Sequence, residues 1–165
     1  MEPELRALAE SVLNAATSCG SARIVCAESC TGGHIADALT EIPGASKFFC
    51  GGIVAYSAEI KKRLLGVPES TLEHFGIVSR ECAEAMARGA LNALDADWAV
   101  ATTGVAGPGP QDGIPAGTVC IAVASRESIF SETLFFPDKT REQIKSLATQ
   151  NVLARLAEKI IEASL

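Results

Sequence analysis

The segment 28–33, ESCTGG, places a hydroxyl nucleophile in a glycine-rich turn. It follows the apolar run 22–27, so we expect a buried strand to end here and a helix to begin at the glycines. Free N–H groups at a helix start can bind a phosphate or stabilise an oxyanion. Ser29 is therefore a candidate nucleophile, similar to the elbow serine of hydrolases. The alternative, which the spacing alone favours, is that Ser29 or Thr31 caps the helix.

A serine nucleophile needs a base, and the sequence offers few. The two histidines, His34 and His74, have no obvious acidic partner, so we interpret each as a surface or internally satisfied side chain. A neutral lysine is the other common solution, as in Ser-Lys enzymes. Lys61 is the candidate because it follows a glycine-containing strand. The alternative for Lys61 is a solvated helix lysine like its neighbour Lys62.

The segment 104–117, GVAGPGPQDGIPAG, is a long loop without periodicity. It does not match G-x-G-x-x-G, and Pro108 and Pro110 lack the N–H donors that a pyrophosphate site uses. A loop of this length inside a compact domain is more often functional than a simple surface connection.

A metal site is a third kind of chemistry to weigh. Cys26, Cys30 and His34 recur every four residues, which on one helix would form a metal-binding face. The segment changes from strand to turn to helix, however, so the three side chains should diverge, and no fourth ligand has metal spacing. We expect no metal and no organic cofactor.

Composition narrows the class of protein. The net charge of −6 and the pI of about 5.0 speak against nucleic-acid binding, although a few local donors could still hold one phosphate. No run reaches the roughly 18 apolar residues of a membrane span, and the start, MEPE, is not a signal peptide. None of the six cysteines forms a C-x-x-C pair. We expect a cytoplasmic protein that binds a small molecule and not a membrane; a homo-oligomer stays open.

Helices and strands that alternate along the chain must position these groups. We expect helices over 4–19, 32–40, 58–65, 68–75, 79–94 and 139–163, and strands over 22–27, 48–56, 98–103, 118–125 and 129–136. This order predicts a single-domain α/β fold, a three-layer α/β/α sandwich around a mixed sheet. The two loops at 28–33 and 104–117 each follow a strand. They should therefore meet at one edge of the sheet, where open α/β sheets bind ligands.

Four motifs in order resemble the C-terminal domain of the competence/damage-inducible protein (CinA) family, the nicotinamide-nucleotide amidases. The match covers nearly the whole chain. Its strongest segments are AESCTGG at 27–33, GGIVAYSAEIK at 51–61, HFGIVS at 74–79, and TGVAGP at 103–108 with PAGTV at 115–119. The resemblance implies that 1–165 is one amidase domain, without the N-terminal domain that larger family members carry.

The resemblance also implies a reaction, the hydrolysis of nicotinamide mononucleotide to nicotinate mononucleotide and ammonia in pyridine-nucleotide recycling. The family's catalytic serine falls on Ser29, its lysine on Lys61 and its tyrosine on Tyr56, and the position ahead of the glycine loop falls on Thr103. We expect the substrate contacts to come from Cys30, Thr31, Gly32, Gly33, Gly104, Ala106, Gly107 and Arg141. A nucleotide sensor without turnover, or an amidase for another nucleotide-linked amide, are the alternatives.

The chain departs from the family pattern in places that bear on substrate preference. Ile114 precedes Pro115 where the loop usually carries a lysine. The stretch 137–140, PDKT, replaces the usual approach to the last helix, and Lys145 stands where a second arginine is common.

Overall fold

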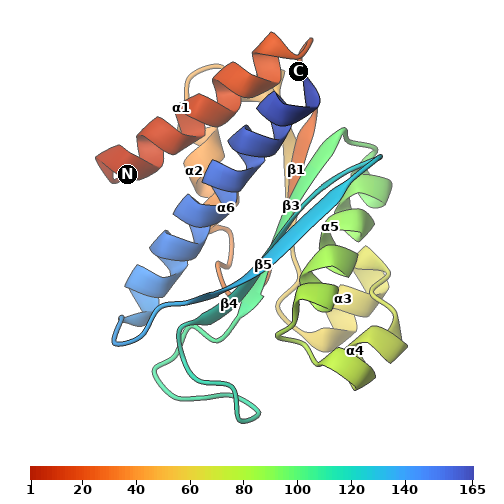
Figure 1. The fold of residues 1–165 in the computed structure, drawn as a ribbon, viewed down its shortest axis with the longest axis vertical. Helices are drawn as coiled ribbons and strands as arrows, with labels where there is room; N and C mark the ends of the chain where they lie inside the picture. The colour runs from red at the N-terminus through yellow and green to blue at the C-terminus, as the bar shows by residue number, and fades with distance from the viewer.

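A mixed sheet of five strands forms the centre of the molecule in this computed structural model, which describes residues 1–165 (Figure 1). The strands are β1 (Ile24–Glu28), β2 (Phe49–Val54), β3 (Trp98–Gly104), β4 (Thr118–Ser125) and β5 (Ile129–Phe135), in the order β2-β1-β3-β4-β5. Strand β1 pairs in parallel with both β2 and β3, whereas β4 and β5 are antiparallel to their neighbours. The mixed sheet and the two consecutive strands β4 and β5 agree with the sequence prediction.

Helices cover both faces of this sheet, which confirms the predicted three-layer α/β/α sandwich. They are α1 (Pro3–Ser18), α2 (His34–Thr40), α3 (Ala58–Leu65), α4 (Glu69–Phe75), α5 (Arg80–Leu94) and α6 (Arg141–Ala163), with a 3-10 turn at Ala45–Lys47. Helices α1, α2 and α6 lie on one face, and α3, α4 and α5 lie on the other (Figure 1). No helix has both the length and the hydropathy needed to cross a membrane.

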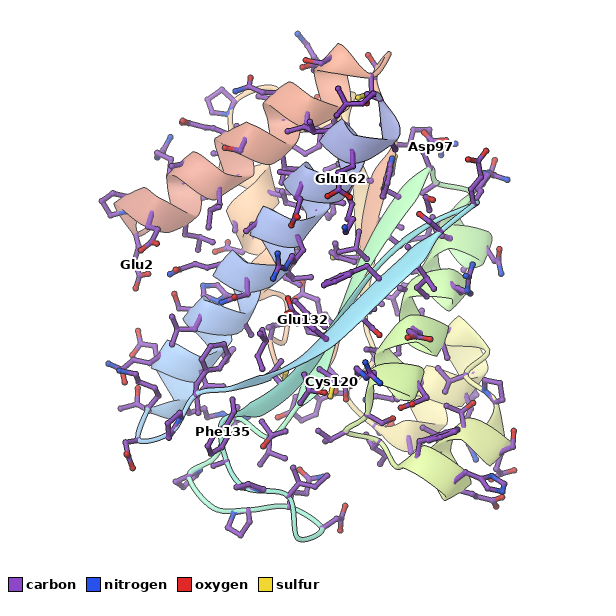
Figure 2. All side chains as sticks on the ribbon, in the orientation of Figure 1. Glu2, Asp97, Cys120, Glu132, Phe135 and Glu162 are labelled. Atoms are coloured by element: carbon purple, nitrogen blue, oxygen red, sulfur yellow. The ribbon has the colours of Figure 1, made fainter.

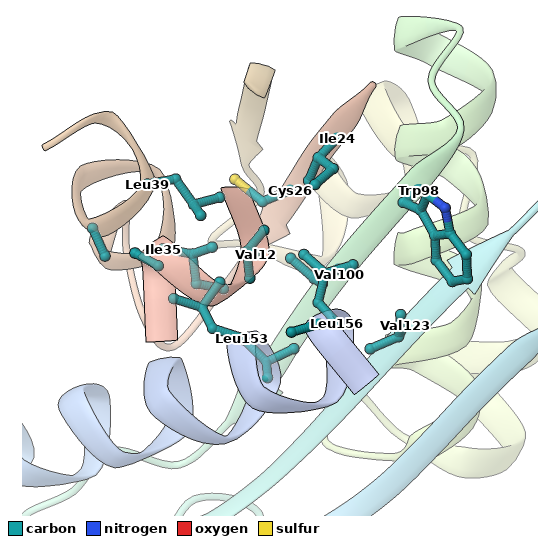
Figure 3. Close-up of a cluster of buried hydrophobic side chains, with 14 of the residues drawn as sticks. Val12, Ile24, Cys26, Ile35, Leu39, Trp98, Val100, Val123, Leu153 and Leu156 are labelled. Atoms are coloured by element: carbon teal, nitrogen blue, oxygen red, sulfur yellow. The ribbon is translucent and has the colours of Figure 1, made fainter. Parts of the chain in front are cut away.

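Strand β1 is buried along its whole length because it packs against both helical layers. Ile24 and Cys26 belong to the apolar cluster formed with α1, α2 and α6, which Figure 3 shows, whereas Val25 and Ala27 belong to the cluster on the α5 face. Side chains fill the space between the sheet and each helical layer (Figure 2). This alternation follows from the two-residue period of a strand and fixes the register of the central strands.

The glycine pair in β2 follows a bulge and makes room for a side chain of β1. Cys50 is an extra residue in β2, so the register with β1 shifts there. A side chain on Gly52 would overlap the Cys26 thiol. The bulge at Cys50 therefore lies directly before the glycine pair, and Gly52 leaves room for the Cys26 thiol.

Several predicted boundaries were wrong by one or two residues, and two of these differences affect the site. Strand β1 extends through Glu28, which the sequence had assigned to the turn. Helix α2 begins at His34 because Gly32 and Gly33 have φ values of 60° and 101°, which are outside the helical range. The last helix begins at Arg141, two residues later than predicted, because Thr140 caps it in a complete capping box.

The three parallel strands end at one edge of the sheet, and each leads directly into a segment with candidate site residues. Strand β1 leads into the turn at Ser29, β2 into the segment before α3, and β3 into the loop over 105–117. Because ligands of open α/β sheets bind beyond the carboxyl ends of parallel strands, this edge is where the site is expected.

Candidate active site

Ser29 and Lys61 form a direct hydrogen-bonded pair at this edge. The Nζ of Lys61 donates to the Oγ of Ser29 over 2.8 Å and to the carbonyl oxygen of Ala55 over 2.8 Å. Ser57 caps α3 by accepting a hydrogen bond from the N–H of Ile60, which fixes the start of the helix that carries the lysine. Nucleophile and amine are therefore within proton-transfer distance before any substrate binds.

The environment of Lys61 favours its neutral form. Its side chain is fully buried on the inner face of α3, together with Leu65 one turn later, and no carboxylate pairs with it. Burial lowers the pKa of Lys61 below its ordinary value of 10.5, and the nearby thiols of Cys82 and Cys30 offset only part of this shift. A lysine in this setting can act as a base.

Cys30, the residue after the serine, is not a competing nucleophile. Burial raises the pKa of its thiol to about 12, so the thiol form prevails at neutral pH. Ser29 lines the same cavity as Cys30 and has the amine partner that an activated hydroxyl needs.

Two buried polar residues that were not predicted as site residues form hydrogen bonds that support the turn at Ser29. Glu28, fully buried, accepts hydrogen bonds from the hydroxyl of Thr31 and from N–H groups of α2. Thr102 of β3 shares a hydrogen bond with Thr31, and its carbonyl accepts the N–H of Ser29 over 3.0 Å. The only signal in the sequence was a pair of threonines, 102 and 103, inside an otherwise apolar strand.

A cavity of about 450 Å³ opens in front of Ser29. The segment before α3, the loop after β3 and the link between α4 and α5 all contribute to its wall. The predicted site residues that line it are Ser29, Cys30, Tyr56, Thr103, Gly104, Ala106, Gly107 and Arg141, together with Ile77 and Val78 of the HFGIVS motif. The four motifs of the sequence therefore converge on one cavity, with Lys61 and Thr31 buried behind its wall.

Arg141 connects three parts of this cavity. Its guanidinium donates to the carbonyl oxygen of Gly107 over 2.8 Å and to the hydroxyl of Tyr56 over 2.8 Å. No carboxylate lies within ion-pair distance of it, so its charge is not neutralised by the chain.

The hydroxyl of Thr103 donates to the carbonyl of Ile77 over 2.8 Å, which ties β3 to the segment before α5.

A second cavity, of about 590 Å³, adjoins the first at Arg141. Its lining is entirely polar or glycine and consists of Gly32, Gly33, His34, Asp37, Arg141, Glu142 and Lys145. The Nζ of Lys145 makes no hydrogen bond or ion pair and lies 3.7 Å from the position that a side chain on Gly32 would occupy. Lys145 thus belongs to the site, whereas Ile114 pairs with Gln111 in the loop and lines neither cavity.

Cys26, His34 and His74 each contact a different partner. The thiol of Cys26 donates to Glu28, and the Nδ1 of His34 lies 3.4 Å from the hydroxyl of Thr149. His74 is on the surface, with its Nδ1 2.7 Å from the carbonyl of Ser70. No three His, Cys, Asp or Glu side chains gather as a metal-binding group.

Known proteins are similar to this chain in both sequence and fold. The family model described as the CinA C-terminal domain matches residues 5–160. A CinA-like protein of Shewanella loihica is 43% identical over 157 residues, which cover 94% of this chain and 37% of that protein. A protein of Shewanella oneidensis named nicotinamide-nucleotide amidohydrolase PncC is 46% identical over 123 residues, covering 74% of this chain and 29% of that protein. The chain spans about a third of the length of the curated relatives it matches.

Solved structures resemble the chain along almost its whole length. A CinA superfamily protein from Klebsiella pneumoniae superposes with a TM-score of 0.91 at 35% identity, covering 96% of this chain and 98% of that chain. A competence/damage-inducible protein from Agrobacterium tumefaciens superposes with a TM-score of 0.90 at 37% identity, covering 94% and 95%.

Proposed function

We propose, starting from the fact that this chain belongs to the CinA C-terminal domain family, that it hydrolyses the carboxamide of nicotinamide mononucleotide by a Ser-Lys mechanism. The observation that carries the proposal is the 2.8 Å contact between the Oγ of Ser29 and the buried Nζ of Lys61 at a cavity wall. The name of the Shewanella oneidensis relative supports the choice of amide.

In the first step Ser29 attacks the carboxamide carbon and its proton passes to neutral Lys61. A neutral amine has two N–H groups and one lone pair, so it can keep its hydrogen bond to Ala55 while it accepts the serine proton. Lys61 then returns this proton to the departing nitrogen, which leaves as ammonia. The same amine then deprotonates water, which attacks the acyl-serine ester. Lys61 passes this proton to the Ser29 oxygen as nicotinate mononucleotide leaves, which restores the free serine and the neutral amine.

The negative charge that develops on the carboxamide oxygen needs preorganised donors. Within 30–33, the N–H of Gly32 already bonds to the Ser29 carbonyl and that of Gly33 to Glu28. The N–H groups of Cys30 and Thr31 make no hydrogen bond to another residue, and Cys30 lines the cavity. We assign the oxyanion to the N–H of Cys30, because Thr31 is buried behind the cavity wall.

The phosphate of the substrate needs a separate set of donors, because the chain as a whole is anionic. Arg141 carries an unneutralised charge at the junction of the two cavities, and Lys145 carries another in the second cavity. A nucleotide can therefore place its carboxamide at Ser29 and its phosphate at Arg141, toward Lys145. Tyr56, held by Arg141, and Thr103 position the intervening part.

The test is to incubate the purified protein with nicotinamide mononucleotide, nicotinamide riboside or nicotinamide, and to measure ammonia and the acid product together. We expect equimolar ammonia and nicotinate mononucleotide, with strong preference for the nucleotide. Tight binding of the nucleotide without ammonia release would instead identify a binding module. Release from a different nucleotide-linked amide only would replace the substrate and keep the mechanism.

A further inference from the structure

The proposed mechanism leaves one fully buried carboxylate beside the nucleophile without a role. Glu28 is the last residue of β1 and directly precedes Ser29. Its Oε2 accepts hydrogen bonds from the Thr31 hydroxyl over 2.6 Å and from the N–H groups of Gly33 and Ile35 over 3.0 and 3.1 Å. Its Oε1 accepts from the N–H of Ala36 over 3.0 Å and from the Cys26 thiol over 3.5 Å. A carboxylate at the protein surface can bond to water, whereas this buried carboxylate accepts hydrogen bonds from five donors of the protein.

These contacts determine which backbone donors of the turn remain free. Three of the N–H groups at the start of α2, those of Gly33, Ile35 and Ala36, would otherwise lack acceptors and could attract an external anion. Glu28 accepts from all three, so it is the internal hydrogen-bond acceptor at this helix start. The substrate phosphate is thereby left to the cations of the neighbouring cavities.

A hydroxyl chain extends this control to the nucleophile. Thr31 donates to Glu28 and shares a 2.8 Å hydrogen bond with Thr102, and all three side chains are fully buried. The carbonyl of Thr102 in turn holds the N–H of Ser29. Hydrogen bonds therefore connect the Glu28 carboxylate, the turn that carries Ser29 and the central strand β3. Glu28 itself does not line the cavity.

We propose that Glu28 is a positioning residue for the amide hydrolysis. Its carboxylate holds the turn over 29–33 so that the N–H of Cys30 stays free for the oxyanion and Ser29 faces Lys61. The proposal rests on the proposed function, because it assigns Glu28 a part in that same reaction. It predicts a loss that falls on kcat, since the affected N–H of Cys30 acts only as charge develops in the transition state.

The test compares Glu28→Gln with the matched control Ser146→Ala. Glutamine keeps the size of the side chain but presents an amide NH₂ to donors that need an acceptor. We expect kcat to fall about a hundredfold, as on loss of an oxyanion donor, with KM within about threefold. Ser146 is a buried α6 residue whose hydroxyl bonds to Glu2 and Gln150, so Ser146→Ala loses buried contacts elsewhere and should keep wild-type kcat. A folded Glu28→Gln protein with wild-type kcat would overturn the proposal.

A second pair of variants keeps the test decisive if Glu28→Gln does not fold. Thr31→Val removes the hydroxyl that joins Glu28 to Thr102 and keeps the shape, whereas Thr31→Ser restores the hydroxyl. We expect Thr31→Val to lower kcat at least tenfold with little change in KM, and Thr31→Ser to recover most of it. Equal kcat values for the two variants would contradict the proposal.

Labelling of Ser29 by a fluorophosphonate separates this proposal from the choice of substrate. The serine oxygen forms a bond to phosphorus and fluoride leaves, and mass spectrometry follows the product without any amide substrate. We expect the labelling rate to fall in Glu28→Gln in parallel with kcat. Wild-type protein that is labelled but does not hydrolyse nicotinamide mononucleotide would refute the substrate and leave Glu28 to be judged on the labelling rate. Wild-type protein that does neither would remove both proposals.

Discussion

Replacing Lys61 by methionine tests how the buried amine contributes to catalysis. Methionine has a similar length and no branched atoms, so it fills the same space without a lone pair on nitrogen. In the structure this lysine is the one basic group bonded to the Ser29 hydroxyl, and both histidines are engaged elsewhere. Removing a general base typically costs about 10²–10⁴-fold in rate, or about 3–5 kcal/mol in the activation barrier. We expect a loss in this range for kcat/KM. Lys61→Arg should lose as much, because arginine stays protonated.

The same variant tests the ionisation state of Lys61 through stability. Because burial lowers the folded-state pKa below 10.5, the folded wild-type protein binds fewer protons than the unfolded chain between the lowered pKa and 10.5. Its free energy of unfolding therefore gains a contribution as pH rises through that window, and the methionine variant lacks it. The stability of Lys61→Met relative to wild type should be highest at low pH and decline toward pH 10.5. Loss of the hydrogen bond to Ala55 lowers the stability of the Lys61→Met protein by about 1–3 kcal/mol at every pH.

Two assays measure these effects, ammonia release and chemical denaturation, both followed from about pH 6 to about pH 10. Wild-type kcat/KM should rise with pH and then level off. The midpoint of this rise should lie below 10.5, the ordinary pKa of lysine. A folded Lys61→Met protein that keeps activity within about tenfold of wild type would refute the role of Lys61 as base. A stability difference that stays constant over the pH range would refute the lowered pKa.

The remaining predictions concern the nucleophile, the phosphate and metals. Ser29→Ala should abolish ammonia release while denaturation shows a stability change of about 1 kcal/mol or less, since its side chain makes one hydrogen bond. Arg141→Ala should erode a preference for nucleotide over riboside that we place at about a hundredfold, and leave the riboside rate unchanged; equal specificity constants in the wild type would show that no phosphate site exists. Lys145→Ala should raise KM for the nucleotide several-fold, whereas Ile114→Ala, outside both cavities, should not. Treatment with a chelator should leave turnover unchanged, and restoration of a lost activity by zinc would contradict the serine mechanism.

Much of the fold could be predicted because strong periodic patterns mark its elements. The helix ending at Leu94 and the strand starting at Trp98 were found almost to the residue, since apolar spacing and an N-cap at Ser79 define them locally. The convergence of the loops after β1 and β3 was also expected, because each loop follows a strand and open α/β sheets bind ligands at one edge. Boundaries next to glycines were less accurate, because positive φ at Gly32 and Gly33 delays α2 without leaving a periodic signal.

The supporting contacts of the site could not be predicted, because they join distant residues through groups that carry no pattern. The carboxylate of Glu28 is satisfied mainly by backbone N–H groups, and any residue type supplies those. The backbone carbonyl of Ala55, which accepts a hydrogen bond from Lys61, likewise leaves no signal in the sequence. The burial of Lys61, in contrast to Lys62, had a local sign: Lys61 lies four residues before Leu65, on the same face of α3.

Trapping of the acyl-enzyme with hydroxylamine tests the central claim most directly. If Ser29 carries the acyl group, added hydroxylamine should compete with water and convert part of the product from nicotinate mononucleotide to its hydroxamate, and ammonia should still be released from the wild-type protein. The Ser29→Ala protein should form neither product. Ammonia release from both proteins, with no hydroxamate at any hydroxylamine concentration, would contradict a covalent serine mechanism.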